Sequence, residues 1–118
     1  MSAPVVAIIS YDIEFYEKLE FLFPHTDAKS WYAGNPEKIK SAGEMNATLQ
    51  GAYFMLAARA VGLDCGPMGG FNNQTLDEEF FPDGKTKSIF ICALGQGDTS
   101  KIYPRGPRLG FNEACEIV

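Results

Sequence analysis

The sequence has no excess of positive charge and no long apolar run. It contains 10 Lys and Arg residues against 15 Asp and Glu residues, which gives a formal net charge of −5. Nucleic acids and anionic lipid surfaces bind basic proteins, so we expect neither as a partner. No stretch approaches the roughly 20 apolar residues that a membrane-spanning helix needs. The sequence therefore predicts no membrane association.

Cysteine and histidine are scarce as well. Cys65, Cys92 and Cys115 are widely spaced without a CxxC pair, and His25 is the only histidine. A structural zinc site needs about four such ligands in close spacing, so we expect no metal. The first residues lack the basic region of a signal peptide. Together with the odd number of cysteines, this predicts reduced thiols and a cytoplasmic location.

The sequence does contain enough apolar material for one folded domain over residues 1–118. Hydrophobic residues make up 46% of the chain and aromatic residues 13%, which is too much for a disordered protein. A chain of this size buries roughly 65% of the surface that it exposes when unfolded. We therefore expect a single domain with its own core.

Two segments read as buried strands, residues 5–9 and residues 87–94. Both are rich in β-branched or aromatic side chains and lack polar alternation, which is typical of strands covered on both faces. Two strands alone make a marginal sheet, so we expect a third strand from the tail, residues 98–118, or from a partner. Short helices are predicted after Asp12 and from a capping box that begins at Thr75.

The longest predicted element is a helix from Asn35 to Val61, with Gly62 as its stop signal. Apolar residues lie on more than one side of its second half, so the helix has to be buried on more than one side. We expect a second subunit to provide that cover. The main apolar stripe consists of Met45, Leu49, Ala52, Tyr53, Leu56 and Ala60.

A Gly-rich segment, residues 66–70, is the first candidate for a functional site. Adjacent glycines allow a backbone to come within hydrogen-bonding distance of a flat ligand, since no Cβ intervenes. Backbone N–H groups can then stabilise charge that develops on the ligand. The alternative is that these glycines only end a helix and turn the chain.

The second candidate is a cluster of cations in the acidic chain: Lys101, Arg105 and Arg108. Guanidinium groups three residues apart can bind a phosphate. The alternative is a solvated tail. The other polar candidates read as structural or exposed groups, so we expect no nucleophilic catalysis; they are His25, Cys65 and the acids at 77–79.

Several segments resemble the C-terminal portion of the FMN-dependent nitroreductase family, and within it most resemble the malonic semialdehyde reductase subgroup. The resemblance extends over essentially the whole chain, and it depends on the order and spacing of the motifs rather than on one of them. The segments are APV at residues 3–5, DIEFYE at 12–17, LFPH at 22–25, DAKSW at 27–31, GLDCGPMGGF at 62–71 and PRL at 107–109.

The resemblance implies an α+β fold with a mixed sheet and a long central helix, assembled as an intertwined homodimer with FMN at the subunit interface. It also implies hydride transfer from NAD(P)H to the flavin and then to a small aldehyde or nitro compound, with no catalytic side chain. The family loop that lies against the flavin ring corresponds here to Pro67, Met68, Gly69 and Gly70. Arg108 matches a basic residue that binds the flavin phosphate, and Arg105 is nearest to a second such cation.

The chain also departs from the family pattern, because it begins where family members already enter an internal strand. The preceding third, with its arginine-rich segment, is absent from this sequence. Charge-assisted hydrogen bonds contribute about 1.5–3 kcal/mol each, so we expect FMN binding by this chain alone to be strongly weakened. The alternative function is a non-catalytic homodimeric remnant that binds a ligand or protein through an exposed groove.

Overall fold

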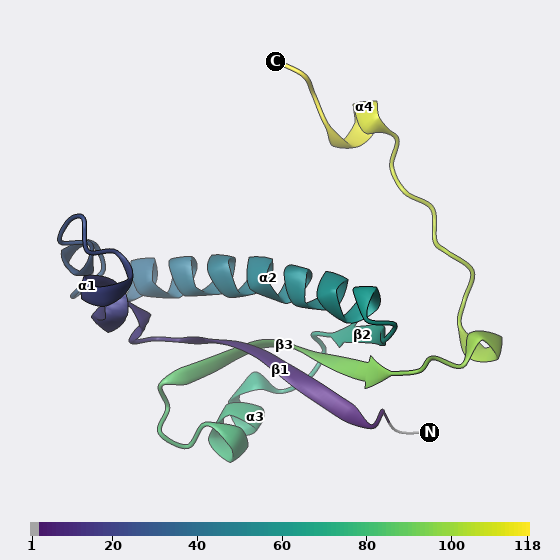
Figure 1. The fold of residues 1–118 in the computed structure, drawn as a ribbon, viewed down its shortest axis with the longest axis horizontal. Coiled ribbons are helices and arrows are strands. Elements are labelled where there is room, and N and C mark those ends of the chain that lie inside the picture. Colours follow the sequence, from purple (N-terminus) through teal and green to yellow (C-terminus); the bar gives the residue numbers. More distant parts are fainter. Residues whose placement is uncertain (1–2) are drawn as a thin grey trace.

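The computed structural model describes residues 3–118 and shows three strands, one long helix and several short helices (Figure 1). Residues Phe15–Lys18, Lys29–Trp31 and Thr99–Lys101 form 3-10 turns. No helix among the residues described combines the length and the apolarity needed to cross a lipid bilayer. The elements in chain order are β1 (Val5–Asp12), α1 (Leu19–Leu22), α2 (Pro36–Ala60), β2 (Asp64–Met68), α3 (Asn73–Phe80), β3 (Thr86–Gly95) and α4 (Phe111–Ala114).

The three strands form one sheet in the order β1-β3-β2. We expected a mixed sheet, but both pairings are antiparallel, because β3 separates the two strands that run parallel to each other. The third strand is β2, where we expected only a Gly-rich turn, and not the tail. β2 lies at a sheet edge, where a strand tolerates Pro67. In this chain, β1 is not covered on both faces, since Val5 and Val6 are about half exposed.

Helix α2 begins and ends where its sequence signals predict. The side chain of Asn35 accepts a hydrogen bond from the Lys38 N–H at 3.1 Å, which caps the first turn. At the other end Gly62 adopts a φ of +86°, and the Leu63 N–H donates back to the Ala58 carbonyl at 3.0 Å. This is the Schellman arrangement that ends many helices with glycine.

Small residues of α2 pack against the sheet. Gly43, Ala47, Gly51 and Ala58 are its buried positions. A Cβ at Gly51 would lie 2.6 Å from Phe90 Cζ, and one at Gly43 would overlap the Tyr11 ring. The two glycines therefore allow the helix to lie closer to the sheet than any larger residue would.

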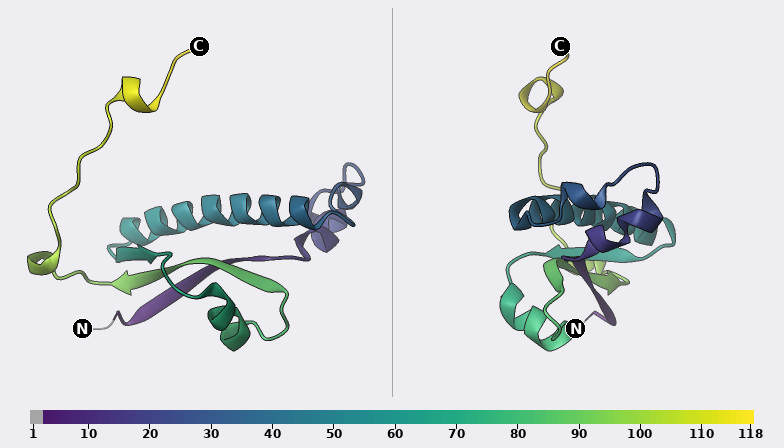
Figure 2. Two further views of the ribbon diagram at one scale, coloured as in Figure 1. Left: turned by 180° about the vertical axis from the view of Figure 1, so that it is seen from behind. Right: turned by 90° about the vertical axis from the view of Figure 1, so that its left-hand side faces the viewer.

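Helix α3 lies on the opposite side of the sheet from α2 (Figures 1 and 2). Its cap is Asn72, whose side chain accepts from the Thr75 N–H, and not Thr75 as we expected. Asp77 is not a solvated helix charge. It is 8% exposed and accepts a 3.0 Å hydrogen bond from the Ser88 N–H. Asn73 donates to the Ser88 carbonyl at 2.9 Å, so α3 caps the β3 edge beyond the end of β2.

The single chain exposes more surface than a compact domain. Its accessible area is 9165 Å², roughly 2,900 Å² more than a monomer of 12.9 kDa exposes. Its radius of gyration is 17.9 Å, against about 13.5 Å for a compact chain of this length. The tail beyond β3 extends away from the sheet and from α2, with exposed residues throughout (Figure 2).

The apolar stripe of α2 is part of that exposed surface. Met45 and Leu49 are 59% and 56% exposed, and Tyr53 and Leu56 are still more open. The chain itself therefore leaves uncovered the face for which we expected a second subunit. Few apolar side chains are buried in the described residues, and Cys92 on the central strand is fully buried.

Candidate functional site

The segment predicted to contact a flat ligand lies at the end of β2 and just after it. Pro67 pairs with Cys92, and Met68 pairs with Ile91, so both are held by the central strand. Gly69 and Gly70 follow as exposed residues, and a Cβ added to either would meet no atom within 4 Å. Among residues 3–118, neither N–H donates a hydrogen bond.

The backbone angles of these glycines differ. Gly62 ends α2 with a positive φ, as a helix-terminating glycine should. Gly69 and Gly70 have no positive φ, so the turn itself does not require glycine there. Their N–H groups have no partner in the described residues, and no side chain covers them. Both backbone donors are therefore open to an approaching group. Such donors can interact with the polar edge of a planar ligand.

The predicted phosphate-binding residues, Arg105 and Arg108, lie in the exposed tail. Arg108 Nη1 donates to the carbonyls of Gly106 and Pro107 at 3.0 Å each. Within the described part of the chain, neither arginine forms an ion pair, so both charges are available to an anion. Lys101 is different, because its Nζ lies 3.0 Å from Asp98 Oδ2.

A single chain does not bring the glycines and the arginines together. The tail leaves from the end of β3 and runs away from the sheet, whereas Gly69 follows the far end of β2 (Figures 1 and 2). Backbone donors can serve a planar ring and guanidinium groups can serve a phosphate, which are the two ends of the FMN that the resemblance implies. They require a second copy, or a different course of the tail, to act on one ligand.

Two cavities lie elsewhere and contain none of the predicted site residues. One of about 550 Å³ lies beside α3, and one of about 420 Å³ lies between β1 and α2. The first is lined by Gln74, Asp77, Glu78, Phe81, Pro82, Gly84 and Lys87, and the second by Ser10, Tyr11, Asp12, Phe15, Ala42, Gly43, Asn46, Ala47 and Gln50.

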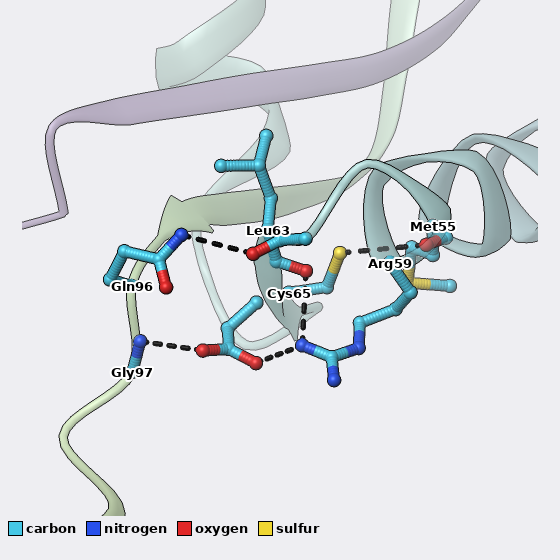
Figure 3. Close-up of polar contacts among 8 residues, drawn as sticks. Met55, Arg59, Leu63, Cys65, Gln96 and Gly97 are labelled. Carbon is cyan, nitrogen blue, oxygen red and sulfur yellow. Dashed lines mark hydrogen bonds and ion pairs between the residues drawn. The ribbon is translucent and has the colours of Figure 1, made fainter.

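The sequence interpretation missed a polar cluster that joins three elements beside the start of β2 (Figure 3). Asp64 pairs through Oδ1 with the Arg59 guanidinium and accepts through Oδ2 from the Gly97 N–H at 2.6 Å. Arg59 Nη1 also donates to the Leu63 carbonyl at 3.0 Å, and Gln96 Nε2 donates to the Gly62 carbonyl at 3.0 Å. No local pattern links residues 64 and 97, so sequence reasoning had no signal for this contact.

The remaining sequence candidates, His25 and Cys65, contact neighbouring side chains or backbone groups. The His25 ring packs edge-on against Phe23, with 5.6 Å between the ring centroids. Cys65 donates to the Met55 carbonyl, and burial, followed by the neighbouring Cys65, raises the pKa of the Cys92 thiol. Over residues 3–118, no three His, Cys, Asp or Glu side chains are grouped so as to hold a metal ion.

Comparisons with known proteins agree with this architecture. A provisionally named NADH dehydrogenase/NAD(P)H nitroreductase of Ralstonia nicotianae is 58% identical over 116 residues, which cover 98% of this chain and 60% of that protein. A relative of similar name from Ralstonia pickettii is 54% identical over 122 residues. This chain thus spans about 60% of the length of the curated relatives that it matches.

Solved structures share the fold at low sequence identity. A nitroreductase-like protein of Bacillus subtilis superposes with a TM-score of 0.86 at 24% identity, covering 98% of this chain and 64% of that one. A nitroreductase-like protein of Exiguobacterium sibiricum, solved in complex with FMN, gives 0.82 at 19% identity and covers 98% and 63%. The α+β class and the long helix are confirmed. Residues 1–96 match the family described as Nitroreductase family, and the chain belongs to that family.

Proposed function

We propose that this chain carries the flavin-ring loop and the phosphate-binding tail of an FMN-dependent NAD(P)H oxidoreductase that reduces a small aldehyde or nitro compound. The observation that supports this most is the pair of open backbone donors at Gly69 and Gly70, which no turn requirement explains. Family membership and the names of the relatives agree with it. Those names do not favour the non-catalytic alternative.

Each proposed binding residue has a distinct task. Pro67 and Met68 present an apolar surface to the flavin ring, while the Gly69 and Gly70 N–H groups donate toward its polar edge. Arg105 and Arg108 bind the phosphate through charge-assisted hydrogen bonds. When bound, FMN supplies the hydride chemistry, and the protein supplies position and electrostatics.

We also propose that the working assembly is a cytoplasmic homodimer. The exposed apolar stripe of α2, from Met45 to Leu56, provides a surface for a second copy. The surplus exposed area is roughly 2,900 Å² per chain, or roughly 5,800 Å² for two chains, which is at the upper end of the total area that obligate homodimers bury. A second copy would also supply a tail and a Gly69–Gly70 loop to the same interface. The three free cysteines agree with a reducing compartment.

Titration with FMN, followed by the quenching of flavin fluorescence, tests the proposal. Arg108→Ala should weaken binding about 10- to 100-fold, because it removes a charge-assisted hydrogen bond to the phosphate. Lys40→Ala is the matched control, since Lys40 is an exposed cation of α2 without an ion pair in the described residues. Since binding by this chain alone is expected to be weak, the titration extends to millimolar FMN. Equal affinities of the two variants, or no FMN binding by the unmodified chain at that concentration, would contradict the proposal.

A further inference from the structure

The tail departs from the sheet at the polar cluster of Figure 3, which we call the root cluster: Arg59, Asp64, Gln96 and Gly97. Asp64 uses its two carboxylate oxygens on two different elements, the end of α2 and the segment after β3. A Cβ at position 97 would lie 2.9 Å from Asp64 Oδ2, so the approach is closest with glycine at this position. The root cluster therefore fixes the chain just after β3.

The next four residues continue this constraint. Asp98 accepts from the Ser100 N–H at 3.1 Å and from the Ser100 hydroxyl at 2.6 Å, and it pairs with Lys101. These contacts hold the 3-10 turn Thr99–Lys101. The hydrogen bonds from Ser100, followed by the Lys101 ammonium, lower the pKa of the Asp98 carboxyl. The chain from Gln96 to Lys101 is thus held in one course as it leaves the sheet.

Among residues 3–118, the tail beyond Lys101 has no hydrogen bond to the sheet or to α2. Arg108 donates to the carbonyls of its own neighbours, Gly106 and Pro107. The backbone bonds of the α4 turn are also confined to the tail. The direction of the tail is therefore set where it is attached, and the root cluster is the attachment.

We propose that Asp64 is a positioning residue: it sets the direction in which the tail leaves the sheet, and thereby directs Arg105 and Arg108 toward the phosphate of a flavin bound between two copies of the chain. This inference rests on the proposed function. Asp64 also begins β2, which ends at the ring-binding Gly69–Gly70 loop. One carboxylate therefore couples the placement of the loop to the placement of the tail.

The exposure of the pair separates positioning from stability. The Arg59 and Asp64 side chains are 58% and 46% exposed, and ion pairs with such exposure contribute little to folding stability. Loss of Asp64 should therefore leave the fold intact while it releases the tail. If Asp64 had a purely structural role, its loss would instead lower folding stability and leave the course of the tail unchanged.

A double-mutant cycle on FMN affinity tests the coupling. Asp64→Ala should weaken FMN binding about 5- to 10-fold in the unmodified chain, but less than about 2-fold when Arg105 and Arg108 are already alanine. Asp64→Asn keeps an acceptor for Gly97 and should retain part of the affinity. Equal losses in both backgrounds would overturn the inference, because Asp64 would then act independently of the arginines.

Glu14→Ala is the matched control, since Glu14 forms an ion pair of similar exposure with Lys85 at 2.8 Å, away from the tail. It should change FMN affinity less than about 2-fold in either background. A loss equal to that of Asp64→Ala would overturn the inference as well.

A second measurement does not require flavin. Nitroxide labels on Cys115 in the tail and on Glu79→Cys in α3, in a Cys65→Ala background diluted with unlabelled chain, report the position of the tail relative to the sheet. The distance distribution should broaden or shift in Asp64→Ala but not in Glu14→Ala. An unchanged distribution would overturn the inference. Absence of FMN binding with the expected broadening would refute only the proposed function.

Discussion

In a self-sufficient domain, the large apolar side chains of a helix face its own sheet. Helix α2 shows the opposite arrangement, with small residues on the sheet and large apolar residues toward solvent. The face on the sheet uses Gly43, Ala47, Gly51 and Ala58, and the face toward solvent carries the stripe from Met45 to Leu56. Burial of a large apolar side chain contributes about 1.5–3 kcal/mol, and burial of a glycine contributes almost nothing. The single chain therefore does not bury the apolar side chains whose burial would stabilise it most.

The sheet face shows what the small residues provide. With glycine opposite Phe90 and Tyr11, the aromatic rings contact the helix backbone directly. The exposed face carries side chains that only another surface can bury. The comparison indicates that α2 packs between its own sheet and a second protein surface. This agrees with the homodimer that we propose.

The largest expected effect is on the exposed face. In a homodimer that buries the stripe, Leu49→Ala should lower the free energy of unfolding by about 2–5 kcal/mol, because it leaves a cavity in the interface. In a chain that stays single, the same change should cost less than about 0.5 kcal/mol. Urea unfolding at several protein concentrations measures both the loss and its dependence on association.

Thr48→Ala is the control for that experiment, since Thr48 is an exposed neighbour on the same helix. Its effect should stay within about 0.5 kcal/mol. If Leu49→Ala behaves like Thr48→Ala, and the urea midpoint does not depend on protein concentration, the exposed stripe does not stabilise the protein through association.

The next effect extends the comparison to the other side of the sheet, where α3 is held by polar contacts instead of small residues. Asp77→Ala should cost about 1–3 kcal/mol, because it leaves the buried Ser88 N–H without an acceptor. Asp77→Asn should recover most of this stability, since its Oδ1 can still accept. Chemical denaturation of both variants, with the exposed Glu79→Ala as reference, checks the prediction; equal losses for Asn and Ala would argue against the hydrogen bond.

A smaller effect is expected on the sheet face of α2. Gly51→Ala places a Cβ 2.6 Å from Phe90 Cζ, and such overpacking costs about 1–3 kcal/mol. The better helix propensity of alanine returns up to about 1 kcal/mol, so the net loss should not exceed about 2 kcal/mol. Thermal unfolding of Gly51→Ala, and of Gly51→Ala with Phe90→Leu to relieve the contact, measures it. Gly69→Ala, whose Cβ meets no atom, should be neutral; a gain in stability for Gly51→Ala would show that the helix can move away from the sheet.

The sequence predicted those parts of the fold whose signals lie close together along the chain. The bounds of α2 follow from Asn35 and Gly62, which act on backbone groups within four residues. The strand around Cys92 follows from its own apolar run. β2 was missed because Gly66 and Pro67 are poor strand formers, and their pairing with β3 depends on residues about 25 positions away.

The candidate site shows the same limit. Gly69 and Gly70 can be singled out because adjacent glycines are visible in the sequence, and their role in binding a ligand stays a prediction. The partnership of Asp64 with Gly97 spans 33 residues and could not be inferred. The buried role of Asp77 was missed for the same reason, since its partner Ser88 belongs to a different element.

The smallest expected effect is a pH dependence of folding stability. It arises at the sheet, at Asp12 of β1, because the apolar stripe of α2 has no carboxylate. Burial alone would raise the pKa of Asp12, but the Glu14 N–H and the Lys18 ammonium lower it below its ordinary value of 3.8. A lowered pKa in the folded state contributes stability that is present above pH 3.8 and is lost as the pH falls through the folded value. Since the Asp12 side chain is 35% exposed, the contribution should stay below about 1 kcal/mol. Urea midpoints between about pH 5 and pH 3 should fall less steeply in Asp12→Asn than in the unmodified chain; parallel curves would assign the acid sensitivity to other carboxylates.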